Sequence, residues 1–279
     1  MSNKIEQKDK KSNITKIILI TISVLFSVIM LIIPLIVLIS NAMYNGFQAY
    51  INAIFNEDAL SALWLTVLAT VAAVLVNTIF GLFAAWTITK FKFRGKQFLT
   101  TLIDIPFAIS PVIAGLVFIL TFGRIGWANS FLQACNMKIV FAVPGIILAT
   151  IFVTFPFVSR EIIPVLNAHG TDEEEAAAIM GANGFNIFRR ITLPHIKWAL
   201  IYGIVLCSAR AMGEFGAVSV VSGHLRGKTN TLPLHVEILY NQFKSTDAFA
   251  VSSVLMILAV IILIIRNIVE YKAKRAGEK

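Results

Sequence analysis

Six apolar runs separated by polar connections constrain this chain more than any other feature of its sequence. A helix needs about 20 mainly apolar residues to cross the hydrocarbon core of a bilayer, where every backbone group must be satisfied internally. The runs therefore predict an all-α polytopic membrane protein with six transmembrane helices. The third run is the shortest and contains Pro106 and Pro111. The six runs are Ile17–Ser40, Ser61–Thr89, Ile105–Phe122, Ile139–Ser159, Ile196–Ser222 and Ala248–Asn267.

The composition excludes an ordinary soluble domain. Hydrophobic residues make up 57% of the chain and charged residues only 14%, against about 25% charged residues in soluble proteins. In a soluble chain the net charge of +9 would suggest a nucleic-acid partner, but in so apolar a chain basic residues set membrane topology. The first run is too long for the core of a signal peptide. Although Ser40-Asn41-Ala42 resembles a cleavage site, we expect a retained first helix.

Basic residues are unevenly divided between the two sides of the expected membrane domain. Of the 24 lysines and arginines, 18 lie in the two tails, in the second and fourth connections, or, as Lys197 and Arg266 do, at the adjoining ends of the runs. Five lie in the third and fifth connections, and Arg210 lies inside the fifth run. The positive-inside rule then predicts that both termini and the fourth connection are cytoplasmic. We expect cytoplasmic tails at residues 1–16 and 268–279, with one transmembrane domain over residues 17–267.

The cysteines and histidines show no pattern of a metal or disulfide site. Cys207 falls within an apolar run and Cys135 in a polar connection, so we expect no disulfide between them. No C-x-x-C and no H-E-x-x-H spacing occurs. The sequence predicts no metal and no cofactor bound by this chain.

The fourth connection, at about residues 171–194, is predicted to form a polar helical hairpin between two hydrophobic membrane-spanning segments. Thr171 is a predicted N-cap, and Glu174 three residues later would complete a capping box. The four acids of Asp172–Glu175 suit the positive end of the helix dipole. Gly181 is the predicted stop of this first helix.

A turn and a second short helix are expected after that glycine. Asn183-Gly184 is a turn signal. The second helix would carry an apolar stripe of Phe185, Phe188 and Ile191 and would end at Leu193-Pro194. The hairpin therefore offers small residues for close approach and an apolar stripe for contact.

Three interpretations of this hairpin can be compared. A hairpin lying on lipid headgroups would favour lysine, yet this segment opens with consecutive acids. A carboxylate site is disfavoured because consecutive acids on a helix point in different directions. A rigid knob that inserts into a soluble partner fits the residues best.

The hairpin resembles the EAA loop of the permease subunits of ABC importers. The residues that match in type and spacing are Glu175, Ala176, Ala177, Gly181, Ile191, Leu193 and Pro194. The resemblance implies a coupling helix that docks into a separate ABC ATPase subunit. No G-x-x-x-x-G-K-[ST] motif occurs in this chain, so ATP would be bound by that partner and this subunit would be no enzyme.

A second stretch, Cys207–Glu237, resembles the permeases of the sulfate/thiosulfate family, and within it the W-type subunit. Its sequence is CSARAMGEFGAVSVVSGHLRGKTNTLPLHVE. Molybdate permeases carry a similar run, so a molybdate or tungstate permease is the alternative. The resemblance implies a multi-pass protein of the cell membrane that works with a sister permease, or with a second copy of itself. It also implies an extracytoplasmic solute-binding protein as a further partner.

Two charged residues within the fifth run, Arg210 and Glu214, are four residues apart and so are predicted to share one helix face. A central arginine costs roughly 2.5–3.5 kcal/mol on insertion scales, so such residues tend to face protein or water. The pair is either a structural ion pair or a restrained cation on the anion path. The loop Ser222–Thr231, with Arg226, is either an oxyanion contact or a solvated loop, and we expect the loop.

Two other classes of protein are alternatives to an importer subunit. A self-contained secondary anion transporter would be expected to show paired repeats and interrupted helices, and the sequence shows no such pair. An intramembrane enzyme would need a nucleophile and base or a metal constellation, and no such grouping stands out.

Overall fold

A computed structural model describes residues 2–277, with side chains for residues 15–273 and 275. The prediction of an all-α membrane protein is confirmed, since this part of the chain forms helices and no strand. Segments long and apolar enough to span a membrane are Thr15–Ala42, Glu57–Lys90, Val143–His169, Gly184–Met212 and Ser245–Ala273. The helices that form these segments, in whole or in part, are α1 (Ser2–Ser27), α2 (Ile33–Ala42), α4 (Glu57–Lys90), α8 (Val143–Thr154), α9 (Pro156–His169), α12 (Leu193–Met212) and α15 (Ser245–Gly277).

The third apolar run forms a broken span rather than a straight helix. Helices α5 (Lys96–Ala108) and α6 (Pro111–Phe122) meet at an angle of 108°. Ser110 is extended, with ψ of 134°, because a residue that precedes proline is sterically driven out of the helical region. The prediction of one helix over Ile105–Phe122 was therefore wrong. The described chain has five spanning helices, or six if this bent pair counts as one span.

The fifth run is also interrupted. Helix α12 ends at Met212, and the short helix α13 (Gly216–Val221) begins after a non-helical break. The single helix expected over Ile196–Ser222 was wrong, because the chain turns here to pack α13 against α6. Glycines allow the close approach: a Cβ on Gly115 would lie 2.7 Å from the Ala217 carbonyl oxygen.

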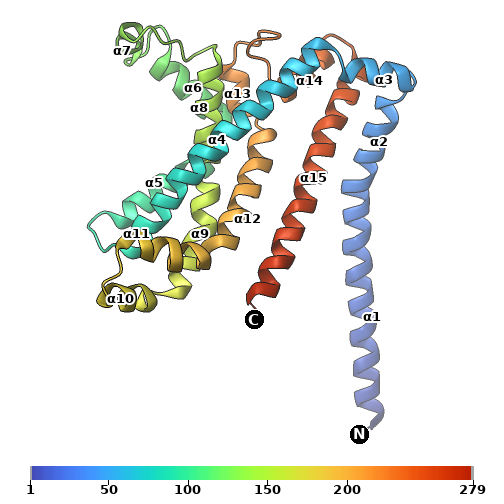
Figure 1. Cartoon of the computed structure of the whole chain (residues 1–279). Coiled ribbons are helices and arrows are strands. Elements are labelled where there is room, and N and C mark those ends of the chain that lie inside the picture. The colour runs from blue at the N-terminus through green and yellow to red at the C-terminus, as the bar shows by residue number, and fades with distance from the viewer. Residues whose placement is uncertain (1, 278–279) are drawn as a thin grey trace.

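The central helix of the bundle is α4, which packs against α8, α9 and α12 (Figure 1). Its packing with α9 and α12 buries Ala85, Val158, Ile162 and Ile196. Helix α15 packs against α12 and α2. By contrast α1 stands apart from the bundle, and none of the most apolar part of the Thr15–Ala42 span is buried.

The two ends of the bundle carry different elements. The outer ends of α1 and α15 lie at the same end as α10 (Asp172–Ile179) and α11 (Gly184–Ile187), as Figure 1 shows. At the opposite end lie α3 (Phe47–Ile54), α7 (Asn129–Ala134) and α14 (Leu232–Asn241). The hairpin and both ends of the described chain therefore lie at the same end of the bundle.

Candidate functional site

The hairpin of α10 and α11 is a stiff body closed by a glycine turn. Gly181 has a φ of +85°, a region that glycine enters without steric cost. The Ala182 N–H donates to the Ala177 carbonyl and the Gly181 N–H to the Ala178 carbonyl, both at 3.0 Å. This pair of bonds is a Schellman motif, so the predicted helix stop at Gly181 is confirmed.

The N-terminal end of α10 differs from the prediction. Thr171 makes no side-chain capping bond to the backbone; its hydroxyl donates to Glu175 Oε1 at 2.8 Å. Glu174 does not reach back to Thr171 but accepts a hydrogen bond from the Thr192 hydroxyl at 2.6 Å. The predicted capping box was wrong, because the Glu174 carboxylate is held by Thr192 of a different helical segment and not by the backbone of Thr171.

The second helix of the hairpin does not end at Leu193-Pro194. Helix α11 continues through a π-helical turn, Phe188–Thr192, directly into α12. Pro194 lies in the first turn of α12, where its missing N–H costs little. The hairpin is consequently an extension of a membrane helix rather than a separate motif.

The exposed apolar residues of the hairpin are only partly those of the predicted stripe. Phe185 is exposed, but the Phe188 ring packs on Trp86 of α4 with centroids 5.1 Å apart, and Ile191 is half-buried. Ile179 and Met180, at the tip, are 88% and 81% exposed. Neighbouring apolar side chains of this kind that stay uncovered can serve as a contact surface for a partner.

The predicted ion pair between Arg210 and Glu214 is present, in a different setting from the one expected. Arg210 lies in the last turn of α12, whereas Glu214 lies in the break after it, so the two do not share a helix face. An Arg210 guanidinium nitrogen is 2.7 Å from Glu214 Oε2. The other carboxylate oxygen accepts from the Ala217 N–H at 2.8 Å, at the start of α13. Glu214 is buried, and the pair therefore fixes the α12–α13 break.

A polar contact in the bundle core was not predicted. Asn77 of α4 is fully buried and donates to Thr154 Oγ1 at 2.8 Å and to the Ile151 carbonyl at 3.2 Å. Its amide nitrogen also lies 3.8 Å from the sulfur of Cys207, so one side chain joins α4, α8 and α12. A single asparagine in a long apolar run gives a signal for such a contact but not for its partners.

The loop Ser222–Thr231 is less solvated than expected. Thr229, Asn230 and Thr231 are buried, and the Leu232 N–H that follows donates to Thr66 Oγ1 of α4 at 2.8 Å. Arg226 is exposed and lies 3.7 Å from Asp58. The prediction of a solvated loop was therefore wrong for its second half, which packs against α4.

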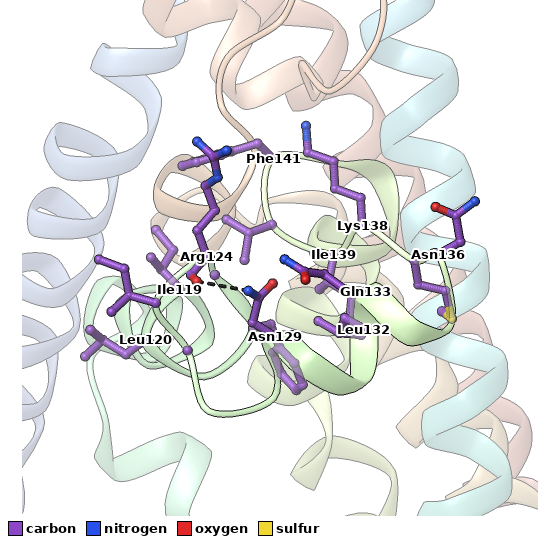
Figure 2. A pocket seen from close by; sticks show the side chains of 16 residues that line it. Ile119, Leu120, Arg124, Asn129, Leu132, Gln133, Asn136, Lys138, Ile139 and Phe141 are labelled. Carbon is purple, nitrogen blue, oxygen red and sulfur yellow. Dashed lines mark hydrogen bonds between the residues drawn. The ribbon is translucent and has the colours of Figure 1, made fainter.

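At the end of the bundle opposite the hairpin, α6, α7 and the following segment line an open cavity of about 870 Å³. Figure 2 shows Arg124 and Lys138 extending in the same direction from its two sides, with Asn129 donating to the Arg124 carbonyl at 3.0 Å. The residues that line it are otherwise apolar or neutral, and none is acidic. The field in the cavity therefore favours an anion.

The sequence matches the family described as "Binding-protein-dependent transport system inner membrane component" over residues 77–277. This match includes the hairpin, the Arg210–Glu214 pair and the outer cavity. The chain belongs to this family. It is a transport permease with several membrane-spanning helices, and the matched region begins within α4, after the exposed first span.

Curated relatives agree with the family match. The chain is 45% identical to the "Sulfate transport system permease protein CysW" of Escherichia coli (strain K12), over 94% of this chain and 90% of that protein. It is 44% identical to the protein of the same name from Synechocystis sp., over 92% and 93% of the two chains. Identity to "Sulfate transport system permease protein CysT" of Salmonella typhimurium is 33%, over 91% of each.

Solved structures show the same fold. A chain from the "Crystal structure of a bacterial ABC transporter involved in the import of the acidic polysaccharide alginate" superposes with a TM-score of 0.78. The superposition covers 96% of this chain and 98% of that chain at 18% identity. A second structure of a bacterial alginate ABC transporter, in complex with an alginate-bound periplasmic protein, gives a TM-score of 0.75 over 96% and 97% of the two chains. The fold is that of an ABC importer permease.

Proposed function

We propose that this chain is the membrane-spanning permease subunit of an ATP-driven importer that moves sulfate or thiosulfate into the cell. The observation that carries the proposal is the rigid, uncovered hairpin with a complete EAA pattern, in a chain 45% identical to a sulfate permease. A self-contained transporter would have no use for a projecting hairpin that exposes Ile179 and Met180 to solvent.

The EAA residues divide into two groups by their surroundings. Ala177 is buried, and Ile191 and Leu193 are half-buried, so these three hold the hairpin against the bundle. Glu175, Ala176, Gly181 and Pro194 are exposed and are the residues proposed to meet the ABC ATPase. ATP would be bound and hydrolysed on that partner, and this chain would take part through contact, without catalysis and without a cofactor of its own.

The remaining partners follow from the two ends of the bundle. An extracytoplasmic solute-binding protein would meet the end that carries α3, α7 and α14, where the cavity between Arg124 and Lys138 favours an anion. A sister permease would complete the membrane domain, as a heterodimer by resemblance or as a second copy of this chain. In this arrangement the protein lies in the cell membrane with both termini in the cytoplasm, because 18 basic residues lie on that side.

Uptake in a reconstituted system tests the proposal. The chain is produced in a strain that lacks its own sulfate importer, together with its neighbouring ATPase, sister permease and binding protein, and uptake of labelled sulfate is measured. The expected result is ATP-dependent uptake that thiosulfate competes strongly and molybdate weakly. The matched control omits only the ATPase. Undiminished uptake in that control would assign the chain to the secondary transporters, and stronger competition by molybdate would reassign the substrate.

A further inference from the structure

The junction between the hairpin and the membrane bundle centres on Lys90, the last residue of α4. Its side chain is only 9% exposed, although it stands at the end of a membrane helix where lysines usually extend into water. The ammonium group lies 2.9 Å from Glu174 Oε2 and donates to the Gly170 carbonyl at 2.6 Å. Lys90 therefore holds both the first helix of the hairpin and the residue at which the chain leaves α9.

Glu174 also connects Lys90 to the second helical arm of the hairpin. Its second oxygen accepts from the hydroxyl of Thr192, which is 2% exposed and ends the π-helical turn before α12. One carboxylate thus links α4, α10 and the start of α12. A turn earlier on α4, Trp86 packs on Phe188 of the same π-helical turn, so a second contact reinforces the link.

The Lys90 contact also restrains the entry to the hairpin from α9. Gly170 has a φ of +67° and ψ of −153°, and a Cβ built on it would meet nothing within 4 Å. Such a residue has few steric restraints of its own. The half-buried His195 and the exposed Glu173 lie 2.8 Å apart, in a contact that solvent weakens. His195 also packs on His169 at the end of α9, with ring centroids 4.5 Å apart. The Lys90 bond to the Gly170 carbonyl and this ring contact together hold the joint.

We infer that the Lys90–Glu174–Thr192 junction transmits displacement of the docked hairpin to α4 and α12, which makes Lys90 and Glu174 positioning residues for coupling. The inference rests on the proposed function. A displaced hairpin moves the bundle only if its attachment to the bundle is stiffer than the turn inside the hairpin. The side chains of a largely buried ion pair that makes two further hydrogen bonds have far less conformational freedom than those of a surface ion pair. Helix α4 is the element to move because it packs on α8, α9 and α12 at once.

The test uses the assembled importer with three single variants and two matched controls. Lys90→Met keeps the side-chain length and removes the charge, Glu174→Ala removes the shared acceptor, and Thr192→Val removes one donor. Lys90→Arg retains the ion pair. Lys92→Met removes a positive charge two residues away, from an exposed lysine that makes no ion pair in the described part of the chain. Three quantities are measured: ATPase retained after detergent extraction, stimulation of ATP hydrolysis by loaded binding protein, and anion uptake.

We expect Lys90→Met and Glu174→Ala to retain the ATPase while stimulation and uptake fall about tenfold. Thr192→Val should show a smaller loss, and Lys90→Arg and Lys92→Met should resemble the wild type. If the variants lose the ATPase or fail to accumulate, the junction serves folding or docking, and the inference is wrong. Equal stimulation in Lys90→Met and the wild type would also overturn it. A wild-type complex that shows no stimulation at all would instead overturn the proposed function, and the inference with it.

Discussion

The Arg210 guanidinium lies 2.7 Å from the Glu214 carboxylate across the break between α12 and α13. The two side chains differ sharply in exposure, at 33% for Arg210 and 1% for Glu214. The buried partner also caps α13 through the Ala217 N–H. The carboxylate is thus the structural element of the pair, and the arginine neutralises it.

The first prediction concerns this pair. Arg210→Met leaves a buried carboxylate without its partner and should destabilise the complex by about 3 kcal/mol or more. Glu214→Gln retains an acceptor for the Ala217 N–H and should accumulate almost normally. The double variant removes both charges and should recover both abundance and uptake. Recovered abundance with low uptake would contradict the structural role and assign Arg210 to the anion path.

The second prediction concerns Gly181. Its φ of +85° disfavours side chains, but a Cβ there would meet nothing within 4 Å in this chain. Aspartate and asparagine tolerate this region, so Gly181→Asp should insert at near-normal levels. Because position 181 lies on the surface proposed to meet the ATPase, uptake should be lost. Gly181→Asn separates added bulk from added charge at that contact. Wild-type transport by Gly181→Asp would mean that the hairpin is not the coupling element.

A third prediction concerns which end of the bundle is outside. Cys135 is exposed at the end opposite the hairpin, and Cys207 is buried. An impermeant thiol reagent should label Cys135 in intact cells and leave Cys207 unlabelled. In a Cys135→Ser background, a cysteine that replaces Gly184 should react only after the membrane is opened. Labelling of that cysteine in intact cells would invert the proposed topology.

The fourth prediction concerns acid sensitivity at the outer end. His235 of α14, outside the spanning helices, is buried and lies 3.3 Å from the Asn230 side chain. Burial lowers the pKa of His235, and nearby Asp58 and Arg226 act in opposite directions, raising and lowering it. A folded-state pKa below the ordinary value of about 6.5 means that the unfolded chain binds the proton more tightly. Stability should therefore be complete above about pH 6.5 and fall as the pH drops below it.

Thermal unfolding of the detergent-purified complex across pH 5 to 8 (roughly the range in which histidine titrates) measures this effect. His235→Gln removes the titrating group and should flatten the acid side of the profile. His224, which is exposed and 3.5 Å from Glu237, supplies the control variant His224→Gln. An unchanged acid limb in His235→Gln would show that another group is responsible.

The fifth prediction concerns the outer cavity. If Arg124 and Lys138 favour the approach of the anion, neutralising both as Arg124→Gln and Lys138→Gln should raise the half-saturating concentration for uptake. The maximal rate should change little, because both residues flank α7, which lies at the end of the bundle opposite the hairpin (Figure 1). The effect should shrink at high ionic strength, where exposed charges are screened. Lys244→Gln, an exposed lysine at the same end, is the control. A fall in maximal rate alone would point to a role in assembly.

Local patterns in the sequence were enough to predict much of this protein. Apolar runs near membrane length predict membrane spans regardless of their packing neighbours. In a bilayer the backbone N–H and C=O groups must find hydrogen-bond partners within the protein, and a helix provides them within one segment. The helix stop at Gly181 was equally readable, since a left-handed C-cap depends on a few neighbouring residues. The resemblance of the hairpin to an EAA loop also depends on residues close together in the sequence, and it indicated the importer class.

The predictions from sequence failed where contacts between distant segments override a local pattern. Pro106 and Pro111 were noted in the third run, but the 108° bend was not predicted, and the separate α13 depends on how α6 and α13 pack together. Thr171 and Glu174 have the spacing of a capping box, yet Glu174 binds Lys90 and Thr192 instead. A local motif cannot show that a stronger charged partner is nearby.

What the sequence alone determined is therefore the membrane class, the first, second, fourth and sixth spans and the glycine turn of the hairpin, since each depends on residues within a few turns of one another. Only the tertiary structure decided that Lys90 meets Glu174, that Asn77 joins three helices, and that Phe188 is covered while Ile179 is free. Those partners are distant along the chain, and their contacts exist only once the bundle brings α4, α9 and α12 together. The physical reason is that hydrogen bonds and ion pairs act over a few ångströms, so their partners are set by packing geometry and not by local spacing.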